Sequence, residues 1–289
     1  MTPPELLQIV SPDGAICQGV IVVADAPCDD VALIVPAMGV PARFYAPFAA
    51  SLQACGVASL TMELRGTGTS SVRASRSVDF GYDAIVRHDL PAAVAAARQH
   101  FGSSRVHAIG HSLGGQMASL VLAREPALLA SLCLVASGSV DYRGFAGWQA
   151  YSVLVRSQLA RLLALTLGYY PGHRVGFGNL QPRQLMIDWS DQIRTGRYAP
   201  AGPPFDYEAA LGQAQAAVLA ISLVGDTLST AQSCDLLCAK LSAARIDRHH
   251  LNLPMPEVRN GSDVHFRWVR NAQPIARQIA TWIRALRGQ

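Results

Sequence analysis

The sequence is poor in charge, and lysine is almost absent from it. Only 15% of the 289 residues are charged, against about 25% in a typical soluble domain, while 50% are hydrophobic. This composition excludes a disordered tail or a charged coiled coil and predicts a chain with a large core. Lys240 is the single lysine among 24 basic residues, and the net charge is only +4. Because the arginines are scattered singly, we expect no nucleic acid partner.

Long apolar runs and cysteine motifs are also missing. No apolar stretch reaches the roughly 20 residues that a transmembrane helix requires, and the N-terminal segment lacks the basic and apolar regions of a signal peptide. The six cysteines have no metal-ligand spacing. We therefore expect a reduced, cytoplasmic protein that has no transmembrane segment and needs no metal and no cofactor.

Short β-rich runs alternate with helical stretches along most of the sequence. Apolar runs at 6–10 and 15–24 flank a Pro-Asp-Gly turn and predict an antiparallel hairpin. Strands are then predicted over 31–37, 56–63, 105–110, 131–137, 217–225 and 245–253, with helices over 43–54, 82–100, 114–124, 229–242 and 274–287. This βαβ repetition predicts an α/β fold with a mostly parallel, twisted sheet and helices on both faces.

The alternation fails between residues 139 and 203. This stretch is first helical and aromatic, and then rich in glycine and proline. We interpret it as a helical cap, or lid, inserted into a core made of residues 1–138 and 204–289.

The segment Gly110-His111-Ser112-Leu113-Gly114 matches G-x-S-x-G, a pattern that is common by chance. Its context makes it informative, since it follows the predicted strand at 105–110 and opens a predicted helix. A sharp turn in this setting presents a serine oxygen at the carboxyl edge of a parallel sheet, and it needs glycines because side chains would collide there. The sequence therefore predicts Ser112 as a nucleophile.

A serine needs a base to take its proton, and the base needs a carboxylate to orient it. Asp226 directly follows an apolar strand and is the candidate acid, with Asp141 as the rival and a helix N-cap as the alternative role of Asp226. His265 is expected in the loop between the last strand and the last helix, which completes the order Ser, Asp, His. The other histidines lie before the serine, in predicted strands, in the cap or, for His111, inside the turn itself.

Acyl transfer also needs hydrogen-bond donors for the negative oxygen that develops on the carbonyl. The backbone N–H of Leu113 is one candidate, and the N–H of Met38, after the first parallel strand, is the second. The glycine-rich segment 63–70 lacks the Gly-Lys-Ser/Thr ending of a phosphate-binding loop, so we interpret it as a structural turn.

Several motifs together carry a family resemblance: GHSLGG, PAMGVPARFYAPFA, RGTGTS and DFGYDAIVRHDLPAA, with the late Asp and His-Phe placements. Over nearly its whole length the chain resembles bacterial α/β-hydrolases of the serine aminopeptidase and monoacylglycerol-lipase-like branch. The resemblance implies an α/β-hydrolase fold with a helical cap, a triad of Ser112, Asp226 and His265, and oxyanion donors at Met38 and Leu113. Val264 and the residues after Asp226 depart from the pattern of that branch, which bears on the substrate more than on the chemistry.

The cap sequence 152–170 is apolar on most of its faces, with two arginines as its only charges. It predicts a pocket lined by Trp148, Tyr151 and Leu154, or else a homodimer contact through the cap or a lid at a membrane surface. We expect a small-molecule acyl substrate, an ester or thioester with an apolar acyl or aromatic group. The alternatives are an acyltransferase, a thioesterase or cyclase of a biosynthetic pathway, a peptide hydrolase, or a non-catalytic ligand-binding member of the fold.

Overall fold

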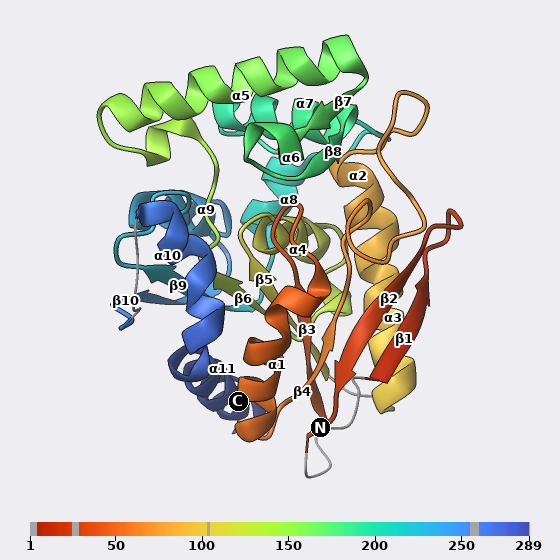
Figure 1. Ribbon diagram of the computed structural model, residues 1–289. Helices are drawn as coiled ribbons and strands as arrows, with labels where there is room; N and C mark the ends of the chain where they lie inside the picture. The colour runs from red at the N-terminus through yellow and green to blue at the C-terminus, as the bar shows by residue number, and fades with distance from the viewer. Residues whose placement is uncertain (1–4, 25–28, 103–104, 255–259, 289) are drawn as a thin grey trace.

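The computed structural model describes residues 5–24, 29–102, 105–254 and 260–288, so that Cys28 lies outside it. An eight-stranded sheet runs through the molecule (Figure 1). Its strands are β1 (Glu5–Val10), β2 (Ile16–Val22), β3 (Asp30–Val35), β4 (Ala58–Thr61), β5 (Arg105–His111), β6 (Ser131–Val135), β9 (Ala217–Leu223) and β10 (Arg245–Leu251). Their order is β1-β2-β4-β3-β5-β6-β9-β10, with β2 antiparallel to both its neighbours and all other pairs parallel. The predicted hairpin and mostly parallel sheet are confirmed.

The continuous apolar runs are explained by helices on both faces of the sheet. In β3, Val31, Leu33 and Val35 pack into one core cluster, while Ala32 and Ile34 pack into a second cluster on the opposite face. The first face is covered by α3 (Leu90–Phe101), α4 (Leu113–Arg124), α8 (Tyr207–Gln213) and α9 (Ala231–Lys240), and the second by α1 (Ala46–Ala54) and α11 (Gln273–Ala285). Single 3-10 turns lie at Ala42–Tyr45, Pro126–Leu128, Tyr142–Gly144, Trp268–Asn271 and Leu286–Gly288.

The predicted helix at 82–100 contains a local irregularity. It begins as α2 (Tyr82–Ala84), passes through a π-helical turn (Ile85–Asp89) and continues as α3. Asp89, in the π turn, accepts hydrogen bonds from Ser11 Oγ at 2.8 Å and from Arg65 Nε at 3.0 Å, and Arg65 also pairs with Asp13 at 2.6 Å. The glycine-rich loop that carries Arg65 thus ties the β1–β2 hairpin to the helix.

Within the segment that joins β6 to β9, residues 139–203 form what we call the insertion. It contains α5 (Trp148–Leu167), β7 (Tyr169–Pro171), α6 (Gly172–Val175), β8 (Leu180–Pro182) and α7 (Arg183–Thr195). In Figure 1, α5 runs across the top of the molecule, above α6 and α7. The small two-stranded sheet of β7 and β8 was not predicted from the sequence. The division into core and cap at these boundaries stays a prediction.

Helix α5 packs through its small side chains. Ser157, Ala160 and Ala164 are buried, and α7 lies against them. Large apolar side chains spaced three or four residues apart are exposed along the other face: Trp148, Tyr151, Val155, Leu159, Leu162 and Leu165. No helix in the described part of the chain, α5 included, combines the length and apolarity needed to cross a bilayer.

A buried carboxylate joins the insertion to the core. Asp188 of α7 accepts hydrogen bonds from the backbone N–H of Tyr82 at 2.8 Å, from Gln184 Nε2 at 2.9 Å and from the N–H of Ala201 at 3.3 Å. Burial raises the pKa of the Asp188 carboxyl to about 6, although these hydrogen bonds act in the opposite direction.

This pKa predicts how stability depends on pH. The folded chain binds a proton at Asp188 more tightly than the unfolded chain, so the Asp188 contribution to the free energy of unfolding falls as pH rises from about 4 to about 6, by on the order of 3 kcal/mol. Urea unfolding of the wild type and of Asp188→Asn across this range measures it, with Asp191→Asn on the same helix as the control for a lost carboxylate. The difference in free energy of unfolding between the wild type and Asp188→Asn should fall with pH. A difference that stays constant or rises contradicts the prediction.

Candidate active site

Strand β5 ends in a sharp turn at Ser112, whose backbone has φ 54° and ψ −121°. The glycines on both sides are required by close packing. A Cβ at Gly110 would lie 2.2 Å from the Cα of Gly115, and one at Gly114 would lie 2.2 Å from the carbonyl oxygen of Val35. Because these neighbours are backbone atoms, they cannot move aside. The predicted strand, turn and helix around the serine are confirmed.

The loop after β3 lies beside this turn, since Gly114 touches the backbone of Val35 and Pro36. It carries Met38, and α4 begins with Leu113. Among the described residues, neither of these two backbone N–H groups donates a hydrogen bond within the chain. The two N–H groups are therefore unpaired beside the serine, and their role as oxyanion donors stays a prediction.

His265 lies in α10 (Gly261–Arg267) and not in the loop where the sequence placed it. The helix forms because Asn260 caps it, accepting a hydrogen bond from the N–H of Asp263 at 3.1 Å. The Nδ1 of His265 lies 2.8 Å from Oδ2 of Asp226. His265 is 1% exposed and Asp226 5% exposed, so water screens this pair only weakly.

Backbone groups hold the Asp226 carboxylate in place. Its Oδ1 accepts hydrogen bonds from the N–H groups of Leu228 at 2.8 Å and Ser229 at 3.0 Å, which leaves Oδ2 for the imidazole. The N-cap of α9 is Thr230, so Asp226 does not have the helix-capping role that was its alternative.

The rival carboxylate, Asp141, is used differently. It caps the turn at Tyr142–Gly144 by accepting from the N–H of Arg143 at 3.0 Å, and it pairs with the Arg143 guanidinium at 2.8 Å. The structure therefore brings Asp226, and not Asp141, to His265.

His111, the residue before Ser112 in the turn, contacts His265. The rings of His111 and His265 have centroids 4.8 Å apart. No hydrogen bond between the Ser112 hydroxyl and His265 is present in the described part of the chain. Such contacts are often long in a free enzyme and shorten when substrate binds.

Of the three residues predicted to line a pocket, Trp148 and Tyr151 point largely into solvent, at 82% and 61% exposure, and Leu154 is half-buried. The start of α5 nevertheless lies close to the site, because Gln149 Nε2 donates to the carbonyl oxygen of Thr227 at 2.7 Å. That these three residues line a substrate pocket stays a prediction.

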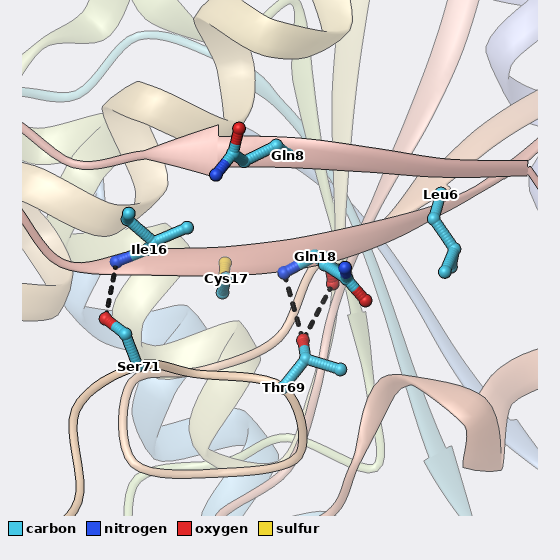
Figure 2. A pocket seen from close by; sticks show the side chains of 7 residues that line it. All are labelled: Leu6, Gln8, Ile16, Cys17, Gln18, Thr69 and Ser71. Carbon is cyan, nitrogen blue, oxygen red and sulfur yellow. Dashed lines mark hydrogen bonds between the residues drawn. The ribbon is translucent and has the colours of Figure 1, made fainter.

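A separate hollow lies along β1, β2 and the loop after β4 (Figure 2). The hydroxyls of Ser71 and Thr69 accept hydrogen bonds there from the backbone N–H groups of Ile16 and Gln18, both at 2.9 Å. Burial raises the pKa of the Cys17 thiol to about 12, so it remains protonated near neutral pH. This hollow offers no activated nucleophile, and none of its lining residues belongs to the candidate triad.

No group of three or more His, Cys, Asp or Glu side chains is arranged to hold a metal ion, as far as residues 5–24, 29–102, 105–254 and 260–288 are concerned. The five cysteines among them are free thiols.

Comparison with known proteins identifies the family. Residues 37–226, well over half of the chain, match the family described as the alpha/beta hydrolase fold. The chain belongs to the alpha/beta hydrolase family. No curated protein matches it by sequence. The narrower serine aminopeptidase and monoacylglycerol-lipase-like branch stays a prediction.

Solved alpha/beta hydrolase structures share the fold at low sequence identity. A putative lipase from Acinetobacter baumannii AYE has a TM-score of 0.65 and 18% identity, covering 99% of this chain and 93% of that one. Est1E from Butyrivibrio proteoclasticus, solved with ferulic acid, has a TM-score of 0.64 and 13% identity, with coverages of 94% and 97%. The esterase domain of a Rhodothermus marinus protein has a TM-score of 0.62 and 14% identity, with coverages of 98% and 99%.

Proposed function

We propose that the chain is a serine hydrolase that cleaves a carboxylic ester or thioester through an acyl-enzyme on Ser112. The observation that carries the proposal is the buried contact of 2.8 Å between His265 Nδ1 and Asp226 Oδ2, beside a strained turn that bears the serine. A serine needs a base and an orienting carboxylate, and both reach the same sheet edge from later segments of the chain.

In the proposed reaction, Ser112 Oγ attacks the substrate carbonyl carbon while its proton passes to Nε2 of His265. Asp226 accepts the Nδ1–H and stabilises the imidazolium. As the bond to the leaving group breaks, the leaving alcohol or thiol takes the proton from Nε2. Water then repeats these steps on the acyl-enzyme, and the products are a carboxylic acid and free Ser112.

The negative charge on the tetrahedral oxygen is assigned to the N–H groups of Met38 and Leu113. Each donor of this kind stabilises the transition state by about 3 kcal/mol. The close contact of Gly114 with the backbone at Val35 supports the assignment, because it holds the two donor segments against each other.

The proposed substrate carries an apolar acyl or aromatic group, as the composition of α5 suggests. One structure of similar fold holds ferulic acid, an aromatic carboxylic acid. Acyl transfer to an alcohol, amine or thiol by the same acyl-enzyme is the second candidate, which includes thioesterase or cyclase chemistry. The apolar stripe on α5 also supports the predicted homodimer through the insertion.

Ser112→Ala is expected to abolish covalent labelling by a fluorophosphonate probe, because the probe needs the serine oxygen and its base. Labelling of the wild type and the variant, followed by mass analysis of the modified peptide, measures this. Absence of labelling in the wild type, or equal labelling in the variant, would show that Ser112 is not the nucleophile.

Asp226→Asn is expected to lower kcat on a p-nitrophenyl ester by about 10³- to 10⁴-fold, because the imidazole loses its orienting carboxylate. Asp141→Asn is the matched control and keeps kcat within about three-fold, since Asp141 caps a turn and contributes about 1 kcal/mol to stability. A large loss in Asp141→Asn with little change in Asp226→Asn would overturn the choice of acid.

Across p-nitrophenyl esters and acyl thioesters of increasing chain length, kcat/KM is expected to rise by up to about four-fold per methylene that enters an apolar pocket. The leaving group stays constant within each series, so that only acyl binding varies. A clear optimum at short polar acyl groups would contradict the apolar substrate.

A further inference from the structure

A chain of hydrogen bonds links the three segments of the candidate site through His111. The Nδ1 of His111 lies 2.8 Å from the hydroxyl of Tyr45, and its Nε2 lies 2.9 Å from the backbone carbonyl oxygen of His265. The Tyr45 hydroxyl in turn accepts a hydrogen bond of 2.8 Å from the N–H of Ala37. Ala37 directly precedes Met38 in the loop after β3. One buried imidazole therefore connects the oxyanion loop, the serine turn and the helix of the base.

The partners of His111 fix the position of its proton. A carbonyl oxygen only accepts, so the 2.9 Å contact with His265 requires a hydrogen on Nε2. The indole N–H of Trp268 also faces Nε2, but at 3.4 Å it is at the long limit of a hydrogen bond. With Nε2 protonated, the neutral ring has a lone pair on Nδ1, which accepts from the Tyr45 hydroxyl.

The surroundings keep this imidazole neutral. His111 is 2% exposed, and burial lowers its pKa well below the usual range, with the charge of nearby His265 acting in the same direction. A second proton would also remove the Nδ1 lone pair that accepts from the Tyr45 hydroxyl. Tyr45 is itself buried and packs edge-on against the imidazole, with centroids 5.8 Å apart.

We propose that His111 and Tyr45 form a positioning unit for the acyl transfer. This inference rests on the proposed function. The two side chains set the distances among Ser112 Oγ, the His265 ring and the Met38 N–H. His111 is covalently next to Ser112, its Nε2–H holds the main chain of His265, and its Nδ1 holds Met38 indirectly through Tyr45 and Ala37. Neither side chain takes part in bond making. Their effect arises because sub-ångström displacement of reacting groups slows a reaction sharply.

Isosteric variants separate the two ends of the unit. Tyr45→Phe keeps the ring packing and removes the hydroxyl, which leaves the N–H of Ala37 and the Nδ1 of His111 without their partner. His111→Gln supplies an amide N–H for the carbonyl of His265 and removes the ring Nδ1 that Tyr45 contacts. Both should lower kcat and the fluorophosphonate labelling rate by about 10- to 100-fold, with KM unchanged within about three-fold.

The double variant tests whether the two residues act together. Residues of one unit are non-additive, so Tyr45→Phe with His111→Gln should reduce kcat about as far as the more severe single variant. Two independent packing defects would instead lower kcat by the product of their separate factors. A loss of that size in the double variant counts against the proposal.

His107→Gln is the matched control. His107 lies in the same strand, is fully buried, and also bridges two polar partners, with Nδ1 2.7 Å from Ser131 Oγ and Nε2 2.9 Å from Asp30 Oδ1. It lies four residues before His111, away from the serine turn. The substitution should lower the unfolding temperature and leave kcat per folded molecule unchanged.

Nitrogen-15 NMR of the imidazoles gives a readout independent of activity. The His111 signals of the wild type should show the neutral Nε2–H tautomer from pH 5 to pH 8, and Tyr45→Phe should shift the Nδ1 signal. A cationic ring or the Nδ1–H tautomer overturns the unit, as do variants that lose activity only in proportion to folded protein. If Ser112→Ala still labels, the proposed function fails instead, while the NMR result continues to judge the hydrogen-bond chain.

Discussion

Close backbone packing around a serine with a positive φ is the constraint on which the site depends. Ser112 has φ 54°, a conformation that non-glycine residues rarely adopt, and it persists because Gly110 and Gly114 allow main chain from three segments to meet within van der Waals distance. The same contact positions the loop after β3 against the start of α4. The parallel sheet makes this convergence possible, since β3, β5 and β9 all deliver their carboxyl ends to one edge.

The side chains of Asp226 and His111 at this edge find their hydrogen-bond partners within the protein. Asp226 has two backbone donors and one imidazole, and His111 has a donor on one side and an acceptor on the other. Buried groups satisfied in this way are rigid, because any movement leaves a donor or acceptor unpaired at a cost of about 1–3 kcal/mol. The insertion adds a further contact through Gln149, which bonds the segment just after Asp226.

The sheet, the hairpin and the serine turn could be predicted because each has a local signature. A continuous apolar run marks β3, which is buried on both faces, and glycines around a serine between strand and helix mark the turn. His265 was expected in a loop, since a seven-residue helix with one apolar turn has too little periodicity to detect. The exposure of Trp148 and Tyr151 could not be predicted because an apolar pattern does not say which face is covered. The contact of Tyr45 with His111 spans 66 residues and has no local signature, so His111 looked like a variable position of the motif.

The bond between His111 and the carbonyl of His265 closes a loop of 154 residues, with the whole insertion inside it. Contacts of such sequence separation form late in folding, because closing a long loop costs entropy before any contact is gained. A chain still being synthesised, or one cut within the insertion and parted from its later half, would thus carry Ser112 without His265, its proposed base. Labelling of Ser112 by the probe would then begin only when α10 has packed against the serine turn. The rate of labelling after dilution from denaturant would therefore report how fast α10 docks.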